Sequence, residues 1–154
     1  MANQFIEVPS GTLFAFLKAR SFVESVEGHE VVFVRRSAKC PAVVMKVYTS
    51  VSQGAVTARA KDADAIRVTL LGELKGEYNG KPLRPKGFFS RKILRVNSVE
   101  GVLERIRDAC REAAEVARQY ERVCAHCGSP AYTDSGNCYV KSCREAHRNS
   151  YAQP

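Results

Sequence analysis

The sequence predicts an α+β domain, in which an antiparallel sheet of about five strands packs against an N-terminal helix and a long C-terminal helix. Three observations predict it. Residues 30–96 alternate between apolar and polar side chains, residues 98–122 carry an apolar stripe at helical spacing, and residues 123–154 hold four of the six cysteines. With 154 residues, 45% of them hydrophobic, the chain is long enough for one globular domain and a small appendage.

The N-terminal segment is expected to form a helix over residues 10–26. Leu13, Leu17 and Phe22 recur at roughly helical spacing, and Ser10 is expected to be the N-cap. Gly28 follows as a stop signal. This helix is predicted to be part of the core.

Five strands are expected between the two helices, because β-branched and aromatic residues alternate with polar ones and turn residues separate the runs. A loop rich in Gly, Pro and Lys, residues 74–87, is expected to be long and flexible. Since most connections are short, the strands should form a meander with one face under the helices and the other open to solvent. The strands are predicted over residues 30–36, 42–50, 55–60, 65–73 and 88–96.

Residues 98–122 show the clearest helical pattern in the chain. Apolar residues recur every three or four positions from Val99 to Tyr120, with Arg and Glu filling the rest. Such a helix would be about 37 Å long, enough to cross a sheet. Its stripe is expected to pack on the sheet, and it is also a candidate surface for a homodimer.

The charge of the chain is strongly segregated. The net charge is +8, and residues 30–96 alone hold fourteen basic and five acidic residues, a net of +9. This distribution favours a polyanionic partner, nucleic acid above all. The alternative is a basic surface that serves solubility only.

Four cysteines lie close together near the C-terminus with the spacing Cys-x2-Cys-x10-Cys-x4-Cys. Two short pairs separated by a loop are typical of a tetrahedral structural zinc site, and four thiolates leave no open position for catalysis. Gly128 follows the first pair, where a knuckle turn favours positive φ. The alternatives are two disulfides, free thiols, or a histidine ligand, either His126 or His147, of which His147 could replace Cys143. The lack of a secretion signal disfavours disulfides. The expected zinc ligands are Cys124, Cys127, Cys138 and Cys143.

The stretch Cys124-Ala-His-Cys-Gly-Ser-Pro, with Gly136-Asn-Cys138 and Cys143-Arg after it, resembles the zinc ribbons at the C-termini of bacterial type IA topoisomerases. The resemblance covers residues 124–144 and implies a ribbon that binds single-stranded DNA. It departs in a shorter loop between the knuckles and in lacking an aromatic residue just before Cys138. Similar ribbons occur in RNA polymerase subunits and ribosomal proteins. The layout of the preceding residues resembles, more loosely, the PC4-type single-stranded DNA-binding proteins. The chain would then divide into an α+β nucleic-acid-binding domain, residues 1–122, and a zinc-ribbon tail, residues 123–154.

The open face of the predicted sheet carries basic and aromatic side chains. Cations neutralise phosphates, and flat rings stack on unpaired bases. The loop 74–87 adds further lysines and could close over a bound strand as an arm. The alternatives are an ordinary solvated surface, or aromatic residues that belong to the core, because either Phe88 or Phe89 must point inward from a regular strand. The candidate nucleic-acid contacts are Lys46, Tyr48, Arg59, Arg67, Lys86, Phe89, Arg91 and Arg95.

Few sequence motifs in this chain indicate catalysis. The chain has no Gly-rich phosphate loop, no Gly-x-Ser-x-Gly and no His-Glu-x-x-His. Asp62 and Asp64 could hold magnesium in a small nuclease, but they lie between strands, where Asp is common in turns. The expectation is therefore a protein that is not an enzyme.

We expect a single-stranded DNA-binding protein with a structural zinc ion. Single-stranded DNA is preferred over duplex, because no helix carries a basic run that could enter a major groove. The alternatives are an RNA-binding protein associated with translation or transcription, and a ribbon that binds a protein partner. No apolar run of about 18 residues and no signal peptide are present, so the expected location is cytoplasmic and no membrane partner is expected.

Overall fold

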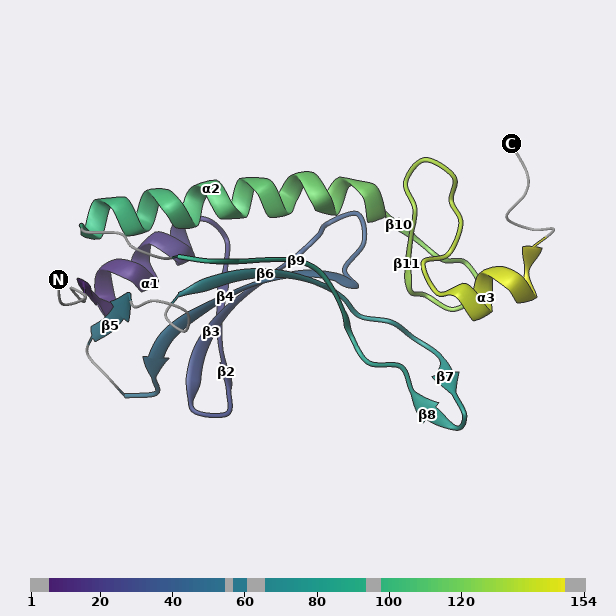
Figure 1. The fold of residues 1–154 in the computed structure, drawn as a ribbon, viewed down its shortest axis with the longest axis horizontal. Helices are drawn as coiled ribbons and strands as arrows, with labels where there is room; N and C mark the ends of the chain where they lie inside the picture. The colour runs from purple at the N-terminus through teal and green to yellow at the C-terminus, as the bar shows by residue number, and fades with distance from the viewer. Residues whose placement is uncertain (1–5, 55–56, 61–65, 94–97, 149–154) are drawn as a thin grey trace, which may run out of the picture.

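The computed structural model describes residues 6–54, 57–60, 66–93 and 98–148 (Figure 1). Its centre is a five-stranded antiparallel sheet with helices on one face, so the predicted α+β fold is confirmed. The helices on that face are α1 (Ser10–Ala19) and α2 (Val99–Ala117), and Figure 1 shows α2 running along the sheet. The strands lie in the order β2 (Val23–Glu27), β3 (Glu30–Arg36), β4 (Val43–Ser52), β6 (Arg67–Gly72) and β9 (Lys86–Lys92).

Smaller pairings complete the part of the chain that the structure describes. They are β1 (Ile6–Pro9) with β5 (Thr57–Ala60), β7 (Glu77–Tyr78) with β8 (Lys81–Pro82), and β10 (Arg122–Val123) with β11 (Pro130–Ala131). A short helix α3 (Lys141–Ala146) follows β11. Figure 1 shows that the β7–β8 hairpin and the unit of β10, β11 and α3 lie at the same end of the molecule, where α2 ends.

The core lies between the helices and the sheet, on the face that the alternating pattern predicts. Val43, Met45 and Val47 of β4 are buried there, next to Val68 and Leu70 of β6. Helix α2 supplies the opposite side of this core with residues spaced by three and four. Those residues are Val102, Ile106, Ala109, Cys110 and Ala113.

The two cysteines outside the C-terminal cluster are core residues. Cys40 is fully buried and Cys110 is 7% exposed, which confirms that Cys110 is a packing residue of the helix stripe. Burial raises the pKa of both thiols, that of Cys110 to about 11. Burial therefore disfavours the nucleophilic thiolate form of both residues.

The N-terminal helix is shorter than predicted: the expectation of a helix over residues 10–26 is wrong beyond Ala19. Ser21 adopts a φ of 70°, in the left-handed region, and the chain turns back there. From Val23 it runs as the edge strand β2, which the β-branched residues of this segment favour. Gly28, with a φ of 62°, belongs to the tight turn between β2 and β3 and does not stop a helix.

The helix boundaries also differ from the predictions. Ser10 is the first residue of α1 and not its N-cap; that position belongs to Pro9, which offers no side-chain hydrogen bond. Ser98 caps α2, accepting a hydrogen bond from the Gly101 amide at 3.0 Å. The α-helical geometry of α2 ends at Ala117, where one 3-10 turn takes over. The long helix is therefore about 28 Å in length.

Two further expectations about the middle of the chain need correction. The strand predicted over residues 55–60 exists as β5, but it pairs with β1, and β2 provides the fifth strand of the main sheet. The predicted flexible loop 74–87 contains the β7–β8 hairpin. Its turn residues, Asn79 and Gly80, both have positive φ, 53° and 76°. An Asn-Gly pair with this geometry is the preferred two-residue hairpin turn.

Candidate metal centre and nucleic-acid interface

The four C-terminal cysteines are brought together as predicted. Their Sγ atoms all lie within 4.8 Å of one another, and none of the four forms a disulfide. The Cys124 and Cys143 sulfurs are 3.8 Å apart, and the Cys127 and Cys138 sulfurs 3.5 Å. A tetrahedron with metal–sulfur bonds of about 2.3 Å has edges of about 3.8 Å. The spacing of the thiols thus fits a tetrahedral metal ion.

Each pair of cysteines is shaped by a turn whose amides point at sulfur. The His126 amide donates to Cys124 Sγ at 3.4 Å, and the Val140 amide donates to Cys138 Sγ at 3.3 Å. Gly128 has a φ of 81°, as expected for a knuckle turn. Amide donors stabilise a thiolate, and hydrogen bonds to the ligand side chains orient metal ligands in general.

The surroundings of Cys138 favour its neutral thiol form as long as no cation is bound. Burial raises the pKa of the Cys138 thiol well above its ordinary value. A metal ion must therefore displace protons to bind, and its affinity must fall as pH falls.

Two histidines flank the cluster without joining the mutually close set of ligand atoms among the described residues. That set contains four cysteines and neither His126 nor His147. The imidazole rings of these two residues stack on each other with centroids 3.8 Å apart and planes 2° from parallel. The arrangement supports four cysteine ligands over the alternative in which His147 replaces Cys143.

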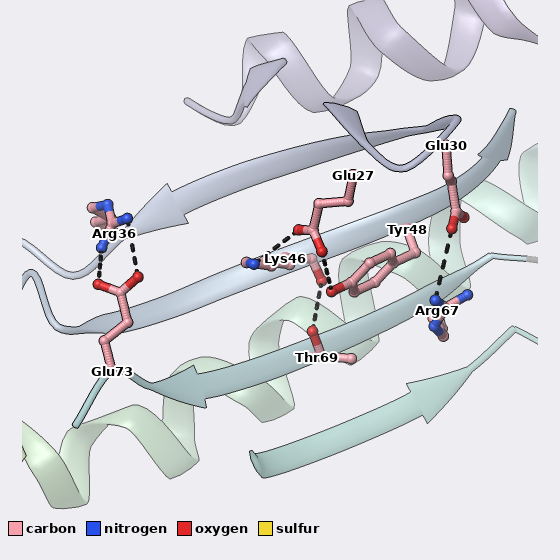
Figure 2. Close-up of polar contacts among 8 residues, drawn as sticks. All are labelled: Glu27, Glu30, Arg36, Lys46, Tyr48, Arg67, Thr69 and Glu73. Carbon is pink, nitrogen blue, oxygen red and sulfur yellow. Dashed lines mark hydrogen bonds and ion pairs between the residues drawn. The ribbon is translucent and has the colours of Figure 1, made fainter. Parts of the chain in front are cut away.

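The predicted nucleic-acid contacts on the sheet face are engaged in ion pairs within the fold (Figure 2). Lys46 Nζ lies 2.8 Å from the Glu27 carboxylate, and the Tyr48 hydroxyl donates to the same carboxylate at 3.2 Å. Arg67 lies 3.7 Å from Glu30, and its guanidinium covers the Tyr48 ring at 4.0 Å from the centroid. The two cations, Lys46 and Arg67, and the Tyr48 ring are therefore already engaged in contacts within the fold.

A third ion pair lies at the end of the same sheet face. Arg36 forms a two-pronged hydrogen-bonded pair with Glu73, the residue that follows β6 (Figure 2). Two of the acidic partners, Glu27 and Glu30, flank the turn of the β2–β3 hairpin. Although the central segment of the sequence has a large positive charge, three cations of its sheet face, Arg36, Lys46 and Arg67, are each paired with a carboxylate.

The structure places Phe89 and Arg91 on the helix side of the sheet, and the prediction that they share the open face is wrong. In the β6–β9 register Phe89 is opposite Leu70 and Arg91 is opposite Val68, both of which are core residues. Arg91 forms an ion pair with Glu112 of α2 at 2.9 Å.

A bulge in β9 explains why both phenylalanines point the same way. The register shifts between Leu70 and Leu71, so that Phe88 has no cross-strand partner of its own. Its ring lies against Gly72 on the helix side, where an added Cβ would be 2.5 Å from Phe88 Cζ. The expectation that one of the two adjacent rings must face the other way holds only for a regular strand.

The remaining predicted contacts are divided between β5, β9 and segments outside the described residues. Arg59 is on β5, paired opposite Glu7 of β1, and β5 is not a strand of the main sheet. Arg95, and the candidate magnesium ligands Asp62 and Asp64, lie outside the described residues. Lys86 is exposed at the start of β9.

Residues 74–87, here called the basic arm, hold exposed cations that the fold does not neutralise. None of their side chains forms an ion pair with another described residue, in contrast to the sheet face. Glu77 is the single acidic residue in the arm. Those exposed cations are Lys75, Lys81, Arg84 and Lys86.

An aromatic cluster joins the sheet to the C-terminal unit, and sequence reasoning did not find it. The Phe88 ring stacks on Tyr120 with centroids 4.1 Å apart, and Tyr132 and Tyr139 lie 5.5 Å and 5.7 Å from Tyr120. All four residues are half-buried. Burial raises the pKa of the Tyr120 and Tyr139 hydroxyls. The sequence signals were the adjacent Phe88 and Phe89 and the position of Tyr120 at the end of the helical stripe.

Comparison of the chain with protein-family models, with curated proteins and with solved structures found no match. Among the described residues, no helix has the length and apolar character needed to cross a bilayer.

Proposed function

We propose that this protein is a non-catalytic single-stranded DNA-binding protein that holds one structural zinc ion at its four C-terminal cysteines. Zinc is favoured among metals because a closed tetrahedral set of thiolates is its typical structural site. Zinc also has no redox chemistry, which suits a purely structural ion. A closed set leaves no position for substrate, so the ion would stabilise the fold of the C-terminal unit and would take no part in a reaction.

The observation that carries the DNA-binding proposal is the unneutralised charge of the basic arm. Phosphate groups bind where cations are exposed and have no competing carboxylate, and four cations of the arm meet this condition, whereas Lys46 and Arg67 on the sheet face are paired with carboxylates. The proposal therefore moves the phosphate contacts from Lys46 and Arg67 to Lys81, Arg84 and their neighbours.

A single strand is favoured over a duplex for two reasons. The long helix is charge-balanced, so it offers no basic face for a major groove. The aromatic cluster is at the same end of the molecule as the arm, and partly exposed rings provide stacking surface for unpaired bases.

The test is fluorescence anisotropy with labelled single-stranded DNA, duplex DNA and RNA of equal length over a series of salt concentrations. Tight binding to the DNA single strand is expected, with a slope of log affinity against log salt of about −3 if four cations each contact a phosphate. Tighter binding to RNA would replace the proposal with an RNA-binding function. Equal and feeble binding to all three would reject nucleic acid altogether and leave a protein partner of the C-terminal unit.

A matched pair of variants locates the surface. Lys81→Glu with Arg84→Glu reverses two charges on the arm, and Arg105→Glu with Arg111→Glu makes the same change on exposed positions of α2. The arm variant should lose affinity by about a hundredfold at moderate salt, and the helix variant should lose much less. Equal losses would mean that net charge alone controls binding.

A further inference from the structure

The base of the basic arm and the metal centre share one small core. The residues buried in this core are Cys124, Ala131, Cys138 and Val140. Leu74 and Leu83, at the two ends of the β7–β8 hairpin, pack against them. The Leu83 amide also donates to the Gly76 carbonyl at 3.0 Å, which closes the base of the hairpin. The arm is thus attached to the metal-binding unit as well as to the sheet.

Ser129 makes the specific contact between the two. Its hydroxyl is fully buried; it accepts a hydrogen bond from the Lys75 amide at 2.7 Å and donates one to the Lys75 carbonyl at 3.1 Å. Both main-chain groups of one arm residue are therefore satisfied by one side chain. The Lys75 stem also lies over Gly128, since an added Cβ there would be 3.2 Å from Lys75 Cδ.

The position of Ser129 is set by the first cysteine knuckle. Its carbonyl accepts the Cys124 amide at 2.8 Å, and the Gly128 amide donates to the Cys124 carbonyl at 2.9 Å. Cys127 is two residues before Ser129 in the chain. A unit with so few buried residues has little hydrophobic stabilisation of its own, so a bound metal would supply much of its folding free energy.

We propose that the metal centre, acting through Ser129 as a positioning residue, holds the basic arm in place, so that binding of polyanions depends on metal occupancy. The inference rests on the proposed function for its ligand, a phosphodiester strand. Loss of the metal would free the knuckle, and the hydrogen bonds to Lys75 would then be lost with it. The arm cations would remain, but ordering them on a strand would cost additional conformational entropy.

The test measures the arm without any nucleic acid. Hydrogen exchange followed by mass spectrometry is carried out on the full chain, zinc-loaded and after treatment with a chelator. The arm peptide, residues 74–87, should lose protection on zinc removal, whereas peptides from β3 and β4 should keep theirs. Unchanged protection of the arm after zinc removal would overturn the inference.

Ser129 variants test the coupling between the metal centre and the arm even if chelation unfolds more than the C-terminal unit. Ser129→Ala keeps all four thiolates, so it should retain one zinc per chain by elemental analysis and still lose protection at the Lys75 amide. Its affinity for single-stranded DNA should fall by about three- to tenfold, because the released arm must be ordered on binding. Ser129→Thr keeps the hydroxyl and should restore most of both properties. Wild-type protection in the zinc-loaded Ser129→Ala protein would refute the role of Ser129.

The two proposals fail in different ways. If the zinc-loaded wild-type protein binds no nucleic acid, the proposed function fails whatever the exchange data show. If it binds a single strand equally well with and without zinc, the proposed function stands and the metal dependence fails. The exchange measurement on Ser129→Ala reports the coupling in either case.

Discussion

The Arg67 guanidinium lies flat over the Tyr48 ring, 4.0 Å from its centroid, on the open face of the sheet. Tyr48 is the one aromatic side chain of this face among the predicted contacts that the structure places there, and a cation already occupies its ring. Because Arg67 is also paired with Glu30, a base would have to displace an intramolecular contact in order to stack. The Tyr48 ring is therefore not an open stacking surface for a base.

Neutralising the sheet face should have little effect on nucleic-acid binding. In Lys46→Gln with Arg67→Gln, single-strand affinity should change by less than about threefold, because both cations are paired within the fold. The matched control, Lys81→Gln with Arg84→Gln, removes the same charge from the arm and should lose about tenfold or more. Anisotropy at one fixed salt concentration distinguishes them. A larger loss in the sheet-face variant would return the binding surface to the sheet.

Removing one thiol should abolish stoichiometric metal binding. Cys138→Ser leaves three cysteine ligands, and we expect less than one zinc per chain after dialysis together with a less stable C-terminal unit. Cys110→Ala, which changes a core cysteine remote from the cluster, should keep the full zinc content. Elemental analysis gives the content, and thermal unfolding gives the stability. Full zinc in Cys138→Ser would mean that a fifth group can serve as ligand.

Zinc retention should also depend on pH. Each thiol must lose its proton to bind the ion, and burial raises the pKa of the Cys138 thiol, so protons compete more strongly with metal as pH falls. Titration from neutral to acidic pH with a colorimetric indicator should therefore show progressive release of zinc. Retention that does not change with pH would contradict thiolate coordination.

A side chain at position 128 should weaken the knuckle. Gly128→Ala adds a Cβ at a φ of 81° and 3.2 Å from Lys75 Cδ. The left-handed conformation alone costs a non-glycine residue about 1–2 kcal/mol, so zinc affinity should fall by about tenfold. Gly11→Ala is the control, since nothing lies within 4 Å of the added atom and α1 favours alanine. Equal zinc affinity in the two variants would contradict the expected weakening of the knuckle by Gly128→Ala.

The alkaline limit of stability should reflect the buried Cys110. Its pKa of about 11 in the folded protein exceeds that of an unfolded thiol, so the unfolded state loses its proton first and gains free energy from doing so. The contribution of Cys110 is fully present below about pH 8.5 and is lost as pH rises towards 11, by up to about 3 kcal/mol. Urea unfolding at several pH values should show a shallower alkaline decline for Cys110→Ala than for wild type. Parallel curves would exclude this thiol as the cause.

The cluster of four cysteines was predictable because it depends on residues that are close together in the sequence. Four cysteines within one short stretch, with a glycine after the first pair, specify two knuckles almost irrespective of the remaining fold. The alternation in β4 and β6 was similarly reliable, since the period of two directly reports which side chains face a core. The Asn79-Gly80 turn was equally local, and recognising it would have predicted the β7–β8 hairpin.

Other features depend on partners far away in the chain. The segment Val23–Glu27 has apolar residues that fit a helix or a strand, and its pairing with β3 decided for the strand. The side of the sheet that Phe89 and Arg91 occupy depends on a bulge that no periodicity reveals. Neutralisation of Lys46 by Glu27 and of Arg91 by Glu112 brings in acidic residues from outside the basic segment.

By itself, the sequence determined the α+β class, the buried faces of the central strands and the clustering of the four C-terminal cysteines, because these follow from short-range spacing and period. Only the tertiary structure decided which cations remain available to a ligand. An ion pair forms between atoms that are close in space, so the net charge of a segment cannot show whether its charges are already neutralised. For the same reason the contact of Ser129 with Lys75, 54 residues apart, is found only in the folded chain.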